Sequence, residues 1–154
     1  MPNTNAGLAA LKILHRALLA GQLIFLAIIL YVSYKRDGFP LEDYGQVFFW
    51  IVVIAGIAAF VFNRKQFSNI IATIKGHNFS DEEKLSKYRA STIKVWAFLE
   101  LVIMLSVIFY FLSGNFYILI ITALLILDFY ALKPTAEKVA SQLDLCEAHL
   151  DDKL

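Results

Sequence analysis

Four apolar blocks, each about as long as a bilayer is thick, constrain the fold of this chain more than any other feature. A membrane-spanning helix needs about 20 mostly apolar residues, and each block meets that length. The predicted fold class is therefore all-α: a four-transmembrane-helix bundle that forms a single membrane domain over residues 1–154. The spans are expected at about 11–34, 45–63, 94–113 and 116–132.

The composition of the chain agrees with this class. Hydrophobic residues make up 59% of it, against about 45–50% apolar in a typical soluble domain. The net charge of +1 implies no strong field for nucleic acid. Cys146 is the only cysteine, which excludes an intramolecular disulfide. The first block is longer than the apolar core of a signal peptide and no A-x-A-like site follows it, so we interpret it as a retained span.

Two of the helices are predicted to continue beyond the membrane. Apolar residues recur at helical spacing after the second span, at Phe67, Ile70, Ile71 and Ile74. Ser80 and Glu83 then stand at capping-box spacing, and no helix breaker follows until Gly114. Residues 64–94 are therefore expected to form a cytoplasmic helical hairpin made of extensions of the second and third helices.

The two chain ends lie outside the predicted spans. Residues 1–10 are polar or small, and they are expected to be frayed. Pro134 can serve as the first-turn proline of a short amphipathic C-terminal helix over 134–150. That helix is expected to pack on the cytoplasmic end of the bundle or on lipid headgroups.

The positive charges predict the orientation in the membrane. Twelve of the fourteen Lys and Arg residues lie on one side: at the N-terminal end of the first span, in or at the edge of the middle loop, or in the C-terminal tail. The two outer loops carry only Lys35 and Arg36. The positive-inside rule then places both termini and the middle loop in the cytoplasm. Trp96, Phe129 and Tyr130 are expected near the inner boundary of the membrane.

A faint internal similarity relates the first and third spans. When residues 20–26 are laid over residues 98–104, Gln22 falls on Glu100. This overlay suggests two tandem two-helix hairpins. Ala17 and Gly21 also stand at small-xxx-small spacing, for which we expect close packing inside the bundle, with a contact between two copies as the alternative.

Glu100 is the most informative residue of the chain, because a carboxyl group inside an apolar span costs roughly 2.5–3.5 kcal/mol on insertion scales. Polar residues expected in the same cytoplasmic third of the spans form a candidate polar cluster: Glu100, Asp128, Gln22, His15 and Arg16. Two interpretations stay open. The cluster handles an ion or a substrate, or Glu100 forms a structural ion pair with Arg16 or Lys94 while Asp128 reaches the headgroups.

Motifs that carry enzymatic or cofactor chemistry are missing from the sequence. The three histidines do not stand at facing depths in the spans, so haem ligation between two histidines is not supported. Neither an HExxH motif, a P-loop nor a GxSxG elbow is present. We therefore predict no catalytic residue, no metal and no cofactor, and we expect a protein that is not an enzyme.

Three stretches carry a resemblance to a known group of proteins: LKILHRALLAGQ (Leu11–Gln22), YRASTIKVWAFLE (Tyr88–Glu100) and LKPTAEKVASQLDL (Leu132–Leu145). Together they cover about a quarter of the chain. They resemble a family of small, uncharacterised bacterial four-helix integral membrane proteins. The resemblance implies a multi-pass protein of the bacterial inner membrane and no known activity.

Two functions compete on this basis. The first is a non-enzymatic scaffold or accessory subunit of a membrane complex, with protein partners bound through the cytoplasmic helices. The alternative is a small proton-coupled transporter that uses Glu100 and works as a homo-oligomer. Both place the chain in a lipid bilayer, and neither involves nucleic acid.

Overall fold

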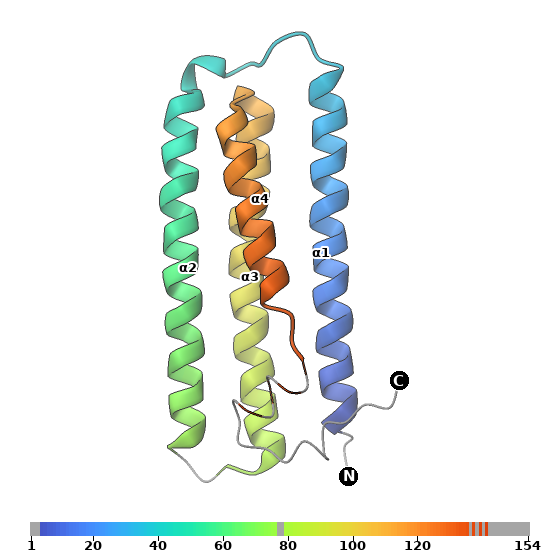
Figure 1. Ribbon diagram of the computed structural model, residues 1–154, viewed down its shortest axis with the longest axis vertical. Helices are drawn as coiled ribbons and strands as arrows, with labels where there is room; N and C mark the ends of the chain where they lie inside the picture. The colour runs from blue at the N-terminus through green and yellow to red at the C-terminus, as the bar shows by residue number, and fades with distance from the viewer. Residues whose placement is uncertain (1–3, 77–78, 136, 138, 140, 142–154) are drawn as a thin grey trace.

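The computed structural model describes residues 4–76, 79–135, 137, 139 and 141 of the chain. Within these residues the protein is all-α, and four helices pack together side by side (Figure 1). The helices are α1 (Thr4–Tyr34), α2 (Gly45–Lys75), α3 (Asp81–Ser113) and α4 (Phe116–Ala131), with a short 3₁₀ turn, η1 (Glu42–Tyr44), before α2. Helices α1 and α3 run in one direction, and α2 and α4 return (Figure 1).

Three of these helices are long and apolar enough to cross a membrane, over Leu8–Tyr34, Glu42–Ile74 and Glu83–Ser113. Helix α4 is equally apolar but has 16 residues. At 1.5 Å per residue it is about 24 Å long, which is less than the roughly 30 Å of a hydrocarbon core. The described chain thus has three candidate membrane spans and one shorter apolar helix, where the sequence predicted four spans.

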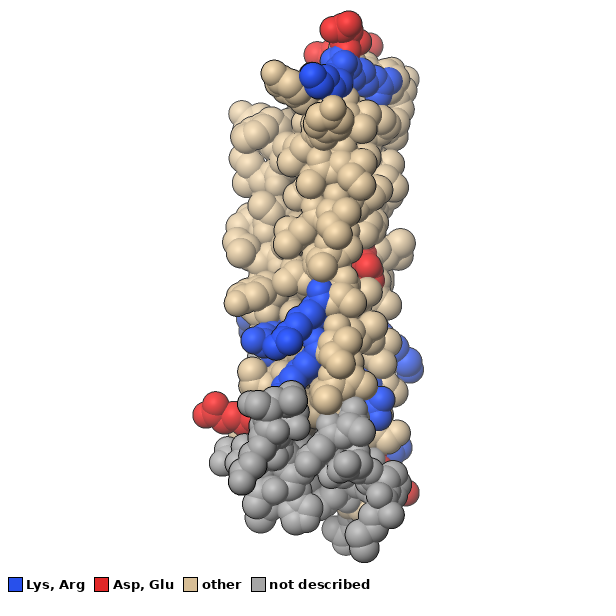
Figure 2. Space-filling model, turned by 90° about the vertical axis from the view of Figure 1, so that its right-hand side faces the viewer, with Lys and Arg blue, Asp and Glu red and all other residues tan. Residues whose placement is uncertain are grey.

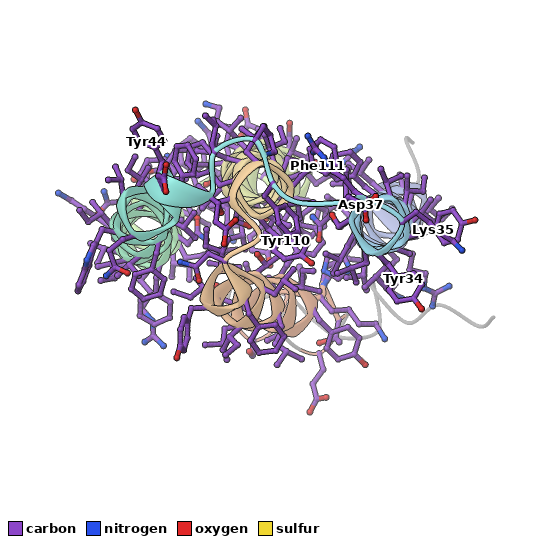
Figure 3. All side chains as sticks on the ribbon, turned by 90° about the horizontal axis from the view of Figure 1, so that it is seen from above. Tyr34, Lys35, Asp37, Tyr44, Tyr110 and Phe111 are labelled. Atoms are coloured by element: carbon purple, nitrogen blue, oxygen red, sulfur yellow. The ribbon has the colours of Figure 1, made fainter. Side chains whose placement is uncertain are left out.

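The four helices are not arranged as two equivalent hairpins. Helices α1 and α2 lie on opposite sides of the α3–α4 pair, as the view along the bundle shows (Figure 3). Only residues 114–115 separate α3 from α4, so these two helices must be neighbours. The connection from α1 to α2 is longer and crosses over the end of the bundle. The tandem-hairpin arrangement suggested by the internal similarity is therefore not seen in how α1 and α2 pack.

Helix α3 is the central element, because it packs against each of the other three helices. Its inward face supplies half of the main core, which joins residues of all four helices: Leu11, Ala59, Val95, Trp96, Leu99, Val102, Ile103, Leu125, Ile126 and Phe129. Trp96 and Phe129 are fully buried, whereas Tyr130 is 58% exposed. Trp96 and Phe129 are thus core residues, and their position near the inner boundary of the membrane stays a prediction.

A second, smaller core lies at the lower end of the bundle in Figure 1 and comprises Leu8, Ile74, Leu85, Tyr88 and Val139. Helix α1 already begins at Thr4, so the prediction that residues 1–10 are frayed is wrong for the part that the structure describes. Burial of Leu8 against α2 and α3 explains this extension. The predicted C-terminal helix over 134–150 lies largely outside the described residues. Within it, the Val139 N–H donates to the Thr135 carbonyl at 3.0 Å.

Helix α3 begins with a complete capping box. The Glu83 N–H donates to the Ser80 hydroxyl oxygen, and the Glu83 carboxylate accepts from the Ser80 N–H at 3.1 Å. Two otherwise unpaired donors of the first turn are satisfied in this way. From this start α3 continues without interruption to Ser113, as the lack of a breaker predicted.

The opposite end of the bundle is closed by contacts between the two connections. Gly114 ends α3 in the left-handed conformation, with φ +67°, and its N–H donates to the Tyr110 carbonyl at 2.8 Å. The ring of Phe39, from the α1–α2 connection, packs directly against Gly114. Asn115 caps α4 and also donates from Nδ2 to the Gly45 carbonyl at 2.9 Å. Tyr34 and Tyr44 point away from the helices at this end (Figure 3).

The two glycines at Gly21 and Gly114 have opposite surroundings. A Cβ atom added at Gly114 would come within 2.3 Å of the Phe39 ring. A Cβ added at Gly21 would meet nothing within 4 Å. The prediction that Gly21 serves close helix packing inside the bundle is therefore wrong. The contact between two copies remains the alternative.

Gly114→Ala is expected to destabilise the bundle, whereas Gly21→Ala is expected to be neutral or stabilising. Alanine at a left-handed position costs on the order of 1–3 kcal/mol, and displacement of the Phe39 ring adds to this. Alanine at Gly21 should gain about 0.5–1 kcal/mol, because glycine is unfavourable inside a helix. Thermal unfolding of the two purified variants in the same detergent measures both effects. Equal losses at the two positions would contradict the packing described for Phe39.

Candidate functional site

His15 has the clearest set of contacts in the candidate polar cluster. Its side chain is 2% exposed, and its Nε2 lies 3.0 Å from the Phe129 carbonyl oxygen of α4. Its ring stacks on the Phe129 ring with centroids 4.8 Å apart, and it lies 5.0 Å from the Trp96 ring. Since a carbonyl oxygen can only accept, Nε2 must carry the hydrogen and donate it.

The hydrogen bond from His15 supports the end of α4. The last carbonyl groups of a helix have no partner within the helix, and Pro134 brings no N–H that could extend it. The Phe129 carbonyl accepts from the Leu132 N–H at 3.1 Å and also from His15. A side chain of α1 thus satisfies the C-terminal end of α4, which is 114 residues away in the chain.

Two further polar groups lie at nearly the same height as His15. The Phe62 and Phe98 rings pack 4.9 Å apart, so the neighbouring Asn63 of α2 and Trp96 of α3 lie at similar heights. Asn63 is 3% exposed, and neither atom of its amide has a hydrogen-bond partner. The Trp96 Nε1 is also buried without a partner. All four helices therefore contribute to one layer, which we call the His15 layer: His15, Asn63, Trp96 and Phe129.

Asn63 and Trp96 were not among the candidate residues predicted from the sequence. Asn63 is the first polar residue after an apolar block, which is the usual pattern for a span that ends at the membrane boundary. Its burial depends on how the helices pack, which the sequence does not show. The sequence feature that could have identified Asn63 is its predicted depth, because Asn63 and His15 both lie near the predicted cytoplasmic boundary of the membrane.

Gln22 occupies a second polar layer, about 10 Å from His15, because the two residues are seven apart on α1. Thr122 is seven residues before Phe129 on the antiparallel α4, so it lies at a similar height. Its hydroxyl is 2.8 Å from that of Ser106 on α3. Gln22 is 1% exposed, yet neither atom of its amide has a hydrogen-bond partner.

The other three candidate residues lie at the surface of the bundle. Arg16 is exposed, and Glu100 and Asp128 are partly exposed. Within the described chain, Glu100 forms no hydrogen bond or ion pair, so the pairing with Arg16 or Lys94 is not observed. Arg64 is the cation that acts electrostatically on Asp128. Figure 2 shows acidic atoms isolated in the apolar band of one face, with basic side chains nearer the lower end.

The structure therefore places two of the five candidate residues, His15 and Gln22, on the inner face of α1. No hydrogen bond joins any two of the five among the residues that the structure describes. Their action as one site stays a prediction. In the same part of the chain, no group of three His, Cys, Asp or Glu side chains is placed to hold a metal ion.

A groove of about 310 Å³ lies apart from these layers, between the lower halves of α2 and α3. Both helices line it, mostly with polar or small residues and with one large apolar residue, Ile70: Gln66, Ile70, Thr73, Lys87, Ala90, Ser91 and Lys94. It was not predicted from the sequence, because it depends on how two helices face each other.

Comparison with protein-family models, with curated proteins and with solved structures finds no match to this chain. The resemblance to small bacterial four-helix membrane proteins therefore stays a prediction.

His15→Ala is expected to lower the free energy of unfolding by roughly 2–4 kcal/mol. The change removes a buried hydrogen bond worth about 1 kcal/mol and leaves a cavity beside Trp96. Gln22→Met is the matched comparison, because its amide makes no hydrogen bond that could be lost. That variant is expected to stay within about 1 kcal/mol of the unchanged protein or to be more stable. Thermal unfolding in detergent compares the two, and a large loss for Gln22→Met would show that its amide is bonded.

Proposed function

We propose that this chain is a multi-pass protein of the bacterial inner membrane that acts as a non-enzymatic scaffold or accessory subunit of a membrane complex. In this proposal both termini and the α2–α3 connection are cytoplasmic. The observation that carries it is the lower core of Leu8, Ile74, Leu85, Tyr88 and Val139. That core fixes the lower halves of α2 and α3 as a helical platform, which is a surface suited to binding another protein.

The proposal requires α4 to act as a fourth crossing. Its 16 residues are followed at once by Leu132, Lys133 and Pro134, so the chain can reach the headgroups soon after the helix ends. A bilayer accommodates a short span by thinning locally, at a fraction of a kcal/mol per Å of mismatch. The His15 hydrogen bond supports this, since it ties the end of α4 to a helix of ample length.

The buried polar groups favour a structural role over a catalytic one. The Nε2 of His15 is committed to a backbone carbonyl, and its ring is enclosed by two aromatic side chains. The Ser106 and Thr122 hydroxyl oxygens lie 2.8 Å apart, and each is also within hydrogen-bond distance of a carbonyl of its own helix, so their two hydrogens are shared among these three contacts. Among the described residues, neither hydroxyl is hydrogen-bonded to a basic side chain that would activate it as a nucleophile.

Reporter fusions test the orientation. Alkaline phosphatase is active only outside the cytoplasm, so a fusion after Asp37 should be active and a fusion after Gly76 should be inactive. A fusion after Lys133 should also be inactive if α4 crosses the membrane. Fusion of a cytoplasmic reporter at the same three points should give the reverse pattern. Phosphatase activity in the fusion after Lys133 would show that α4 does not cross the membrane, and it would overturn the four-span topology.

Glu100 favours the alternative, a small proton-coupled transporter. It is a partly exposed carboxyl group on the apolar part of α3, and it has no hydrogen-bonding partner among the described residues. Ionisable residues in such positions commonly serve proton or ion pathways. A proton carrier would need its carboxyl group to be reached from both sides of the membrane in turn.

Two measurements separate the scaffold from the transporter. For a scaffold, a photo-crosslinker placed at the exposed Ser86 of α3 in living cells should trap a discrete partner protein, while one at the exposed Ile28 of α1 should not. Proteoliposomes should then show no proton flux above that of empty vesicles. Flux that is present in the unchanged protein, lost in Glu100→Gln and kept in Glu42→Gln would support the transporter and overturn the scaffold.

A further inference from the structure

The groove between α2 and α3 is built from two facing stripes of side chains. On α3, Lys87, Ala90, Ser91 and Lys94 recur at the spacing of one helix face. On α2, Gln66, Ile70 and Thr73 do the same. Lys87 and Lys94 stand about 10 Å apart along the helix axis, since seven residues separate them. The small side chains of Ala90 and Ser91 leave the space between them.

The groove carries positive charge from two lysines, and none of the seven described residues that line it is acidic and could balance them. Glu83 stands one turn before Lys87, but its carboxylate is held by the Ser80 N–H and hydroxyl in the capping box. The Lys87 ammonium lies instead 4.6 Å from the centre of the Phe79 ring. The carboxylate nearest in sequence to Lys87 is therefore already engaged, and among the described lining residues the only charges are the two positive ones of Lys87 and Lys94.

The position of the groove along the bundle matches the headgroup region of a bilayer. Lys94 directly precedes the apolar stretch of α3, and Gln66 follows that of α2 by a few residues. The upper end of the groove therefore lies at the edge of the apolar zone. The headgroup layer on each side is roughly 5–7 Å thick, so a headgroup there would reach Lys94 and the upper half of the groove. Lys87 can approach the same group from the water side, because a lysine stem is long and flexible.

We propose that this groove binds the phosphate of an anionic phospholipid headgroup, held by the ammonium groups of Lys87 and Lys94. Basic pockets between membrane helices on the cytoplasmic side suit such headgroups. Gln66 and Ser91 supply neutral hydrogen-bond donors beside the two charges. A headgroup that carries its own cation is disfavoured, because that cation would meet the two lysines. The proposal uses the membrane placement proposed above but does not depend on the scaffold role.

Native mass spectrometry of the full-length protein in detergent tests the proposal, with phosphatidylglycerol and phosphatidylcholine as probes. The unchanged protein should retain phosphatidylglycerol in preference to phosphatidylcholine. The double variant Lys87→Gln, Lys94→Gln should bind phosphatidylglycerol about thirtyfold more weakly, at roughly fivefold for each lysine. Circular dichroism and thermal unfolding check that the variant keeps its fold.

The matched control is the double variant Lys65→Gln, Lys133→Gln, which removes the same charge from exposed positions outside the groove. It should keep the affinity of the unchanged protein for phosphatidylglycerol. Equal weakening in both double variants would show attraction to the surface charge as a whole and would overturn the site. Displacement of the lipid by millimolar inorganic phosphate would assign the groove to a soluble phosphate and overturn the lipid assignment. Crosslinking at Ser86 is independent of both results, so the scaffold and the lipid site can fail separately.

Discussion

The bundle depends on the contact of α3 with every other helix. Its Trp96 is fully buried in the layer where His15 of α1 and Phe129 of α4 meet, and this layer fixes the heights of three helices at once. Helix α2 packs on the opposite flank of α3 through aromatic pairs such as Phe48 with Phe109. Because α1 and α2 stand on opposite sides of the α3–α4 pair, removal of α3 would leave them joined only through their smaller contacts with α4 (Figure 1).

Buried polar groups are distributed unevenly through this core. His15, Ser106 and Thr122 have hydrogen-bond partners, while the amides of Gln22 and Asn63 have none among the described residues. An unpaired buried amide is costly, so these two positions are the places where the interior has unused bonding capacity. Both lie on inner faces of the outer helices α1 and α2, at about the heights of the paired groups. The interior therefore contains a hydrogen bond between helices, from His15 to the end of α4, and two buried amides without a hydrogen-bond partner among the described residues.

The charged side chains of Glu100, Lys87 and Lys94 lie at the surface of α3, unlike the buried polar groups, and their positions are set by the apolar part of the helix. Glu100 sits partly exposed on the apolar part of α3, and the lysines of the groove stand where that apolar part ends. A lysine at this height can keep its ammonium group among headgroups while its stem lies along the helix. Glu100 lies inside the apolar part of α3, and its shorter side chain does not extend its carboxyl group to the headgroups in the same way. The two features thus point to different partners, a lipid phosphate for the groove and a proton or a neighbouring helix for the carboxyl group.

Sequence periodicity alone was enough to predict the helices and the cap at Ser80, since both depend on residues within a few positions of each other. Tertiary structure decided which face of each helix is covered. Trp96 and Phe129 were placed by the sequence only near the inner boundary of the membrane, and the packing of α1, α3 and α4 decided that both are buried. Gly21 looked like a packing position but is open, because none of the described helices comes within 4 Å of a Cβ added there. Likewise the groove at Lys87 and Lys94 exists only where the small residues Ala90 and Ser91 of α3 face α2, a helix that is separate in sequence.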